Sequence, residues 1–98
     1  MIASNHTIVG HAGSHFSYSD ACNLAEQVKA DADTGLVVIE LSRVEDTSTA
    51  ALARLVLLRR ELLRSNRDLR ISGLVGRALN VFAVNRLEAL LPTVGTPQ

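Results

Sequence analysis

The chain has 98 residues, of which 47% are hydrophobic, and its ten basic residues balance ten acidic ones. This length suffices for one compact core but not for two, so we expect a single domain over residues 1–98 and one functional site. The neutral balance provides no excess positive field for a phosphate backbone, which argues against a nucleic-acid partner.

The sequence contains no segment that predicts insertion into a membrane. The longest nearly apolar stretch, residues 50–58, is interrupted by Arg54 and is shorter than the roughly 20 residues that span a bilayer. The first six residues lack the basic start and the apolar region of a secretory signal. Cys22 is the single cysteine, so it has no partner for a disulfide. We expect a cytoplasmic protein in which Cys22 is a small packing residue.

The first half of the chain predicts a strand, a helix and a second strand. Residues 6–9 form a short β-prone run, and a helix is expected from Ser17 or Ser19, either of which can cap it. The core face of this helix has apolar residues at helical spacing: Ala21, Leu24, Ala25, Val28 and Ala32. Residues 36–39 are continuously apolar, as in a strand covered on both faces, and we expect them to form the central strand.

The second half predicts a long helix over residues 50–65, begun by the polar cluster at 45–49. One face of this helix is expected to dock on the sheet: Ala51, Leu52, Leu55, Leu58, Arg59, Leu62 and Leu63. A strand over 69–74 follows, and then a shorter helix after Gly76. The inner side of that helix and the segment behind it are expected to complete the core, through Ala78, Leu79, Phe82, Ala83, Leu87, Leu90 and Leu91. Residues 92–98 are expected to form a flexible tail.

The alternation of strands and helices is typical of an α/β domain. We therefore predict a single α/β domain with a central mixed β-sheet and crossover helices, which are right-handed wherever they join parallel strands.

One segment carries a motif. A strand ending in Glu40-Leu41-Ser42-Arg43-Val44 leads through a hydroxyl-rich turn to Ala50-Ala51-Leu52. This pattern resembles the STAS family of anti-sigma factor antagonists, best over residues 36–91. In that family a strand ending in Asp-Leu-Ser-x-Val precedes a helix that starts with Asp-Ser-Ser-Gly-Leu or Asp-Thr-Gly-Gly-Leu. The resemblance implies a STAS-like fold in which Glu40 stands for the first aspartate, and in which the N-terminal region is shortened by about one strand.

The register of this resemblance decides which hydroxyl matters. Counting without a gap from Glu40 puts Ser48 at the family's loop aspartate, Thr49 at its phosphorylatable residue and Ala51 at its glycine. The helix phase favours this register. Matching on Asp46 instead makes Thr47 the acceptor but shortens the loop by two residues. The resemblance thus implies three candidate phosphoacceptors, with Thr49 first and Ser48 and Thr47 after it.

These three residues, which we call the hydroxyl turn, also have a simpler interpretation. A hydroxyl before a helix can cap it, which stabilises the helix by about 1 kcal/mol. A phosphate there would lie beside unsatisfied N–H groups and the positive end of the helix dipole, so the helix could accept it. One side of the long helix lies off its core stripe. We expect that side and the turn to bind a partner through Asp46, Ala50, Ala53, Leu57 and Arg64, with Leu57 as the anchor.

The resemblance implies a non-catalytic, protein-binding regulatory module. Its expected partner is an anti-sigma factor with a kinase fold. The alternative is a STAS subunit bound to the ATPase of a bacterial phospholipid ABC transporter, which shares the Leu-Ser-Arg-Val and Thr-small-small-Leu-Ala pattern found here over residues 41–44 and 49–53. An exposed apolar face would also permit a homodimer.

The sequence predicts neither a catalytic site nor a metal site. No set of nucleophile, base and orienting residue can be assembled, so we expect no enzyme activity and no cofactor. His6, His11 and His15 are spaced four to five apart, but glycines and a strand edge between them make this spacing incidental, and we predict no metal.

Overall fold

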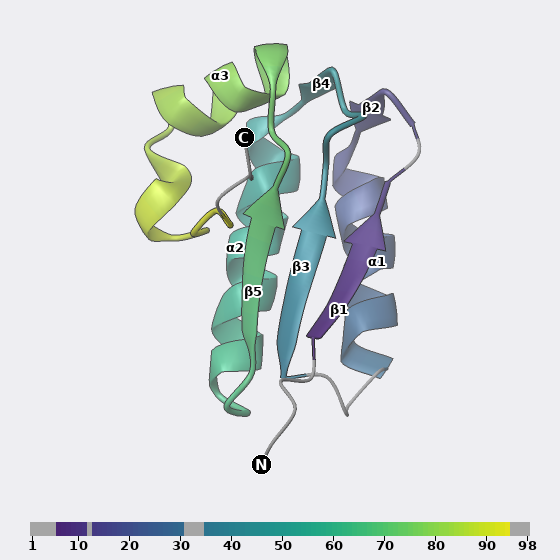
Figure 1. Cartoon of the computed structure of the whole chain (residues 1–98), viewed down its shortest axis with the longest axis vertical. Coiled ribbons are helices and arrows are strands. Elements are labelled where there is room, and N and C mark those ends of the chain that lie inside the picture. Colours follow the sequence, from purple (N-terminus) through teal and green to yellow (C-terminus); the bar gives the residue numbers. More distant parts are fainter. Residues whose placement is uncertain (1–5, 12, 31–34, 95–98) are drawn as a thin grey trace.

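The computed structural model describes residues 6–11, 13–30 and 35–94. Among these residues, the main sheet has three strands, β1 (His6–Gly10), β3 (Leu36–Glu40) and β5 (Asp68–Ser72), in the order β1-β3-β5 (Figure 1). Two further strands of two residues each, β2 (His15–Phe16) and β4 (Asp46–Thr47), pair beyond the end of that sheet. The α/β class and the central place of β3 are confirmed.

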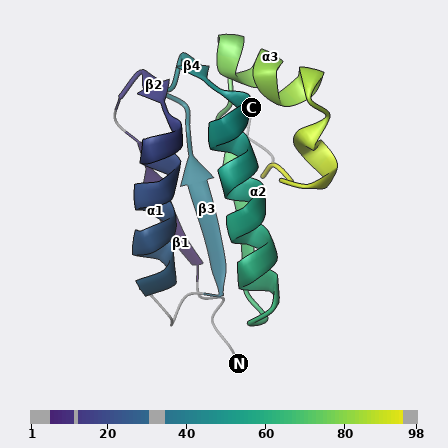
Figure 2. The same cartoon turned by 180° about the vertical axis from the view of Figure 1, so that it is seen from behind.

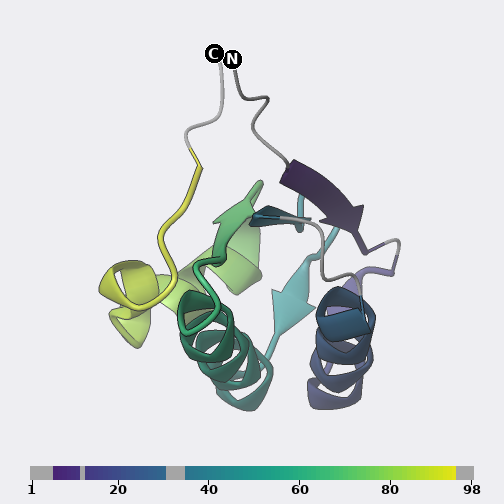
Figure 3. The ribbon, with the colours of Figure 1, turned by 90° about the horizontal axis from the view of Figure 1, so that it is seen from below.

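In the described part of the chain, three α-helices accompany the strands: α1 (Tyr18–Ala30), α2 (Thr49–Leu63) and α3 (Gly76–Val84), followed by the 3-10 turn η1 (Leu87–Ala89). Helices α1 and α2 lie side by side on one face of the sheet, and α3 lies across the end where the strands finish (Figures 1 and 2). The crossovers β1-α1-β3 and β3-α2-β5 advance in the same direction across the sheet. Because such crossovers are right-handed, both helices fall on the same face. The view along the strands shows the other face without helical cover (Figure 3).

The cap of α1 decides between the two serines. The Ser17 hydroxyl accepts a hydrogen bond from the Asp20 N–H at 3.1 Å, and the Ser17 N–H donates to the Asp20 carboxylate at 2.9 Å. This reciprocal pair is a capping box, so Ser17 and not Ser19 is the cap. The expected core residues of α1 are buried, and only Ala32 falls outside the described residues.

The core lies between the inner face of the sheet and helices α1 and α2. Alternate residues of the strands are buried there, while α2 contributes one stripe: Val37, Ile39, Leu69 and Ile71 from the strands, and Ala51, Leu52, Leu55, Leu58 and Leu62 from the helix. Arg59 belongs to the same helix face and is half-buried, with its Nε donating to the Asp68 carboxylate at 2.8 Å. The docking face of α2 therefore forms largely as its apolar spacing predicts.

Four residues that we expected in the core are exposed: Leu63, Leu79, Ala83 and Leu90. Leu63 lies roughly a quarter turn from the middle of the buried stripe of α2, at 3.6 residues per turn. Helix α3 buries only Ala78 and Phe82, so the residues next to them face outward. The expected side chains Leu87 and Leu91 are buried.

Two further expectations were wrong. All strand pairs of the described residues are parallel, where we predicted a mixed sheet. Part of the predicted flexible tail is ordered against β5, because the Ile71 N–H donates to the Pro92 carbonyl at 3.0 Å and the Val94 N–H donates to the Ile71 carbonyl at 2.8 Å. The remainder of that tail, residues 95–98, lies outside the described part of the chain.

Candidate functional site

The hydroxyl turn joins β4 to α2, and its middle residue caps the helix. Ser48 has extended backbone angles, φ −122° and ψ 158°, and its hydroxyl accepts a hydrogen bond from the Ala51 N–H at 3.1 Å. Helix α2 begins at the next residue, Thr49. The Ser48 hydroxyl is therefore occupied by an ordinary capping bond.

Thr47 is directed into the protein. It is the last residue of β4 and only 7% exposed. Its hydroxyl donates to the backbone carbonyl of Phe16 at 2.8 Å, which ties β4 to β2. A modifying enzyme would have to unfold this contact to reach the oxygen, so the geometry favours Thr49 over Thr47 as a modified residue.

Thr49 is exposed at the first position of α2. Its hydroxyl oxygen accepts a hydrogen bond from the side-chain amide of Asn85 at 3.2 Å, and the same amide nitrogen donates to the Val81 carbonyl at 2.8 Å. Asn85 is the C-cap of α3, so this bond links the end of α3 to the start of α2. The first turn of α2 contains no acidic residue, which leaves the positive end of the helix without a compensating charge.

The remaining predicted contact residues are distributed along the outer side of α2. Ala50, Ala53 and Arg64 are exposed, and Leu57 is 45% exposed. These four positions are spaced by three, four and seven residues, so they follow one side of the helix, which we call the contact face. Asp46 is different, because it is half-buried in β4 and its carboxylate accepts a hydrogen bond from the Thr47 N–H at 3.0 Å.

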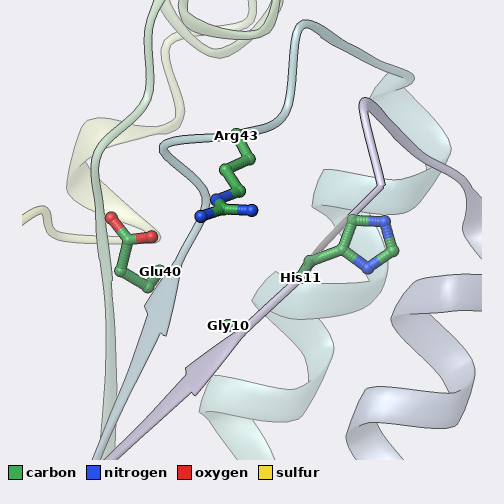
Figure 4. Close-up of a pocket in the computed structure, with 4 residues that line it drawn as sticks. All are labelled: Gly10, His11, Glu40 and Arg43. Carbon is green, nitrogen blue, oxygen red and sulfur yellow. The ribbon is translucent and has the colours of Figure 1, made fainter.

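A shallow cavity of about 230 Å³ lies at the carboxyl ends of β1 and β3, lined by Gly10, His11, Glu40 and Arg43. Figure 4 shows the Arg43 guanidinium reaching back over the strand ends between Glu40 and His11, while the imidazole of His11 points away. The Glu40 carboxylate accepts hydrogen bonds from the Ser42 hydroxyl at 2.8 Å and the Ser42 N–H at 3.3 Å. We did not predict this cavity, since the sequence signals it only through the motif position of Glu40 and the absence of a side chain at Gly10.

Two side chains of α1, Tyr18 and Asp20, have shifted pKa values, and the partners that cause the shifts lie outside the hydroxyl turn. Hydrogen bonds from the N–H and then the hydroxyl of Ser17 lower the pKa of Asp20. A hydrogen bond with Cys22 raises the pKa of Tyr18. Perturbed pKa values often mark active sites, but these belong to a helix cap and to one turn of α1.

The His11 ring is held by structural contacts. Its Nε2 atom lies 3.0 Å from the His15 carbonyl oxygen and its ring packs edge-on against Phe16. Within residues 6–11, 13–30 and 35–94, no three histidine, cysteine or acidic side chains are arranged to hold a metal ion. In the same part of the chain, no helix is both long enough and apolar enough to cross a membrane.

We compared the chain with known protein families, curated proteins and solved structures. No family model matches the chain, and neither a curated protein nor a solved structure is significantly similar to it.

Proposed function

We propose that this chain is a non-catalytic, protein-binding regulatory module of the STAS kind, which acts in the cytoplasm and resembles anti-sigma factor antagonists. The observation that carries the proposal is the placement of Thr49, an exposed hydroxyl at the first position of α2 beside the contact face. The partner would be an anti-sigma factor with a kinase fold, bound over the turn and the contact face.

Phosphorylation of Thr49 would switch this binding. A phosphate adds about 1.5 to 2 negative charges, and the N-terminal end of α2, with its N–H groups and dipole, can accept it without unfolding the helix. The absence of acidic residues from the first turn supports this, because no neighbouring carboxylate there would repel the phosphate. A partner packed over the turn would meet a charged and hydrated group, which weakens binding.

The start of α2 supports the register on which the proposal rests. The gapless match requires the helix to begin at Thr49, and Ser48 caps it at that point. Leu52 and Leu55 are fully buried, as that helix phase requires. The chain departs from the family pattern at Ser48 and Ala51, which stand where the family has aspartate and glycine.

The second candidate is a subunit bound permanently to the ATPase of a bacterial phospholipid ABC transporter. Two observations favour it. The Thr49 hydroxyl already accepts a hydrogen bond from Asn85, as a purely structural residue would, and Leu57 offers an apolar anchor that needs no switch. Under this proposal the hydroxyl turn only caps α2 at a constant interface.

Native capture separates the two proposals. The tagged chain would be isolated from its source cells with its partners, with and without phosphatase treatment, and analysed by intact-mass and peptide mass spectrometry. A phosphate on Thr49 and a partner with a kinase fold support the regulatory module. An unmodified chain held by an ABC ATPase supports the transporter subunit.

Binding by variants then locates the surface. With the captured partner, Thr49→Glu and Leu57→Asp should each weaken binding at least tenfold, as expected for a charge placed in an interface. Gln27→Glu is the control, because Gln27 is exposed on α1, outside the turn and the contact face. Equal binding by Thr49→Glu, Leu57→Asp and the control would place the interface elsewhere and refute the proposal.

A further inference from the structure

The two edges of the main sheet differ in whether another segment pairs with their outward backbone groups. At the β5 edge, the N–H and the C=O of Ile71 both point outward, and both form hydrogen bonds. The N–H donates to the Pro92 carbonyl at 3.0 Å, and the C=O accepts from the Val94 N–H at 2.8 Å. The chain thus covers this edge with its own residues 92–94. Strand β1 forms the other edge, and β3 is the one strand that pairs with it among the residues that the structure describes.

The hydrogen-bond pattern determines which groups of β1 face outward. The His11 N–H donates to the Glu40 carbonyl at 3.4 Å, so His11 points toward β3. Because successive residues of a strand point their N–H and C=O groups to opposite sides, Thr7 and Val9 also point toward β3. The backbone groups of His6, Ile8 and Gly10 therefore point to the free edge, with Ile8 in the middle.

This edge lacks the features that usually prevent a strand from pairing with another chain. Exposed edges are commonly protected by charged residues, especially lysine, or by proline. Residues 6–10 contain neither lysine, arginine, aspartate, glutamate nor proline. The Ile8 side chain is 63% exposed. Its neighbour Val9 packs against the core, so Ile8 lies on the opposite face of the sheet. No helix covers that face (Figure 3).

We propose that β1 pairs in antiparallel fashion with β1 of a second copy of this chain, across a two-fold axis at Ile8. The outward residues are symmetric about Ile8, so the edge is complementary to itself, as a two-fold interface requires. Ile8 would exchange two N–H···O=C bonds with Ile8 of the second copy, and His6 would pair with Gly10. Such hydrogen-bonded pairs place their Cα atoms about 5.5 Å apart, which brings the two isoleucine side chains into contact.

The result is a continuous six-stranded sheet. Helix α1 lies on the β1 side of the sheet and α2 on the β5 side (Figure 3). A dimer across β1 would therefore leave α2 open, and with it Thr49 and the contact face. The inference does not depend on the proposed function. One five-residue strand from each copy buries a small area, and we therefore expect a weak dimer that forms as the concentration rises.

Sedimentation velocity over a wide concentration range tests the proposal with the full chain. The wild type should shift from monomer to dimer, whereas Ile8→Lys should remain a monomer. Ile8→Pro should also remain a monomer, because it removes an outward N–H and spares the bonds to β3; circular dichroism would verify that both variants fold. Leu79→Lys is the control, since Leu79 is similarly apolar and 44% exposed but belongs to α3.

Amide hydrogen exchange identifies the edge directly. The Ile8 and Gly10 amides should exchange more slowly as the dimer forms, while the Val9 amide, which already points toward β3, should not change. A wild-type chain that stays monomeric at every concentration would overturn the proposal. So would a dimer that persists in both Ile8 variants, or Ile8 and Gly10 amides whose exchange does not depend on concentration.

Discussion

The two ends of the main sheet are held by different kinds of interaction. At the carboxyl end, which carries the hydroxyl turn, neighbouring backbone segments pack closely against one another. The Leu41 N–H donates to the Ser72 carbonyl at 2.9 Å, and Gly73 adopts φ +81° directly against Ser42. The amino end also has a backbone bond, from the Asp68 N–H to the Gly35 carbonyl at 2.8 Å. It differs in its ion pairs, because the Asp68 carboxylate pairs with Arg59 at 2.8 Å and with Arg70 at 3.3 Å through side chains that water still reaches.

This difference has a physical consequence. Close backbone packing and buried hydrogen bonds cannot relax when an atom is added or a donor removed, so changes at the carboxyl end should be costly and insensitive to salt. Ion pairs near water contribute little and are screened by salt. We therefore expect the end that bears the candidate site to tolerate substitution less well, and four measurements can test this contrast.

The largest effect is expected at Gly73. A Cβ there would lie 2.6 Å from a Glu40 carboxylate oxygen and 2.9 Å from the Ser42 backbone nitrogen, in a left-handed conformation. Gly73→Ala should lower the free energy of unfolding by about 2–4 kcal/mol, measured by urea denaturation. Gly10→Ala is the matched control at the same end, because a Cβ there meets nothing within 4 Å. Similar losses in the two variants would contradict the proposed role of close packing.

The next effect concerns two threonines that flank the cap. Thr47→Val removes a buried hydroxyl and leaves the Phe16 carbonyl without its donor, which should cost about 1–3 kcal/mol of unfolding free energy. Thr49→Val changes an exposed hydroxyl and should cost less than about 0.5 kcal/mol. Thermal or urea unfolding of both variants gives the comparison. If Thr49→Val proved the more damaging, the assignment of Thr49 to a binding role would lose its basis.

At the amino end the expected effect is smaller and depends on pH. Burial raises the pKa of Asp68, but hydrogen bonds from Arg59, the Leu69 N–H and Arg70 outweigh it and hold the pKa below its ordinary value. The carboxylate therefore contributes fully above the unfolded pKa of about 4, and this contribution disappears as the pH falls through the lowered folded pKa.

The variant Asp68→Asn checks this sign. Near neutral pH it should be less stable than the wild type by about 1 kcal/mol, and the difference should shrink both in acid and in high salt. Urea denaturation at several pH values measures it. A difference that grows as the pH falls would show that the sign is wrong.

The smallest effect is expected from Thr49→Glu. An acidic residue is favourable at a helix start, so the unfolding free energy should change by less than about 0.5 kcal/mol or rise slightly. Circular dichroism and urea denaturation test this independently of any partner. A variant that unfolds would show that the hydroxyl turn cannot accept a negative charge, and phosphorylation at Thr49 would then be untenable as a switch.

The pattern of apolar residues predicted the helices and strands that are long enough to show a buried run or a buried stripe. The apolar run at 36–39 identified β3, and the stripe through Leu52, Leu55 and Leu58 identified the buried side of α2. Strands β2 and β4 have two residues each, which is too short to show any period. The pairing of residues 92–94 with β5 uses backbone groups that every sequence has, so composition could not reveal it.

For the candidate site, the sequence predicted which hydroxyl residues form the turn but not which of them are buried and which are exposed. The three hydroxyls of the turn are nearly equivalent as residue types, and the start of α2 was predicted within one residue. Their separate environments depend on distant partners: Thr47 is buried by Phe16, and Thr49 meets Asn85. Such contacts join residues more than thirty positions apart, which local pattern cannot predict.

The parallel arrangement of the strands also bears on how fast the chain can fold. Parallel neighbours cannot be joined by a tight hairpin, and here partners are thirty and thirty-two positions apart, as for His6 with Leu36 and Leu36 with Asp68. Each pairing requires an entire intervening helix to be brought into place first. We expect folding to be slower than that of a helical bundle of this size, with α1 and α2 formed before the sheet is complete.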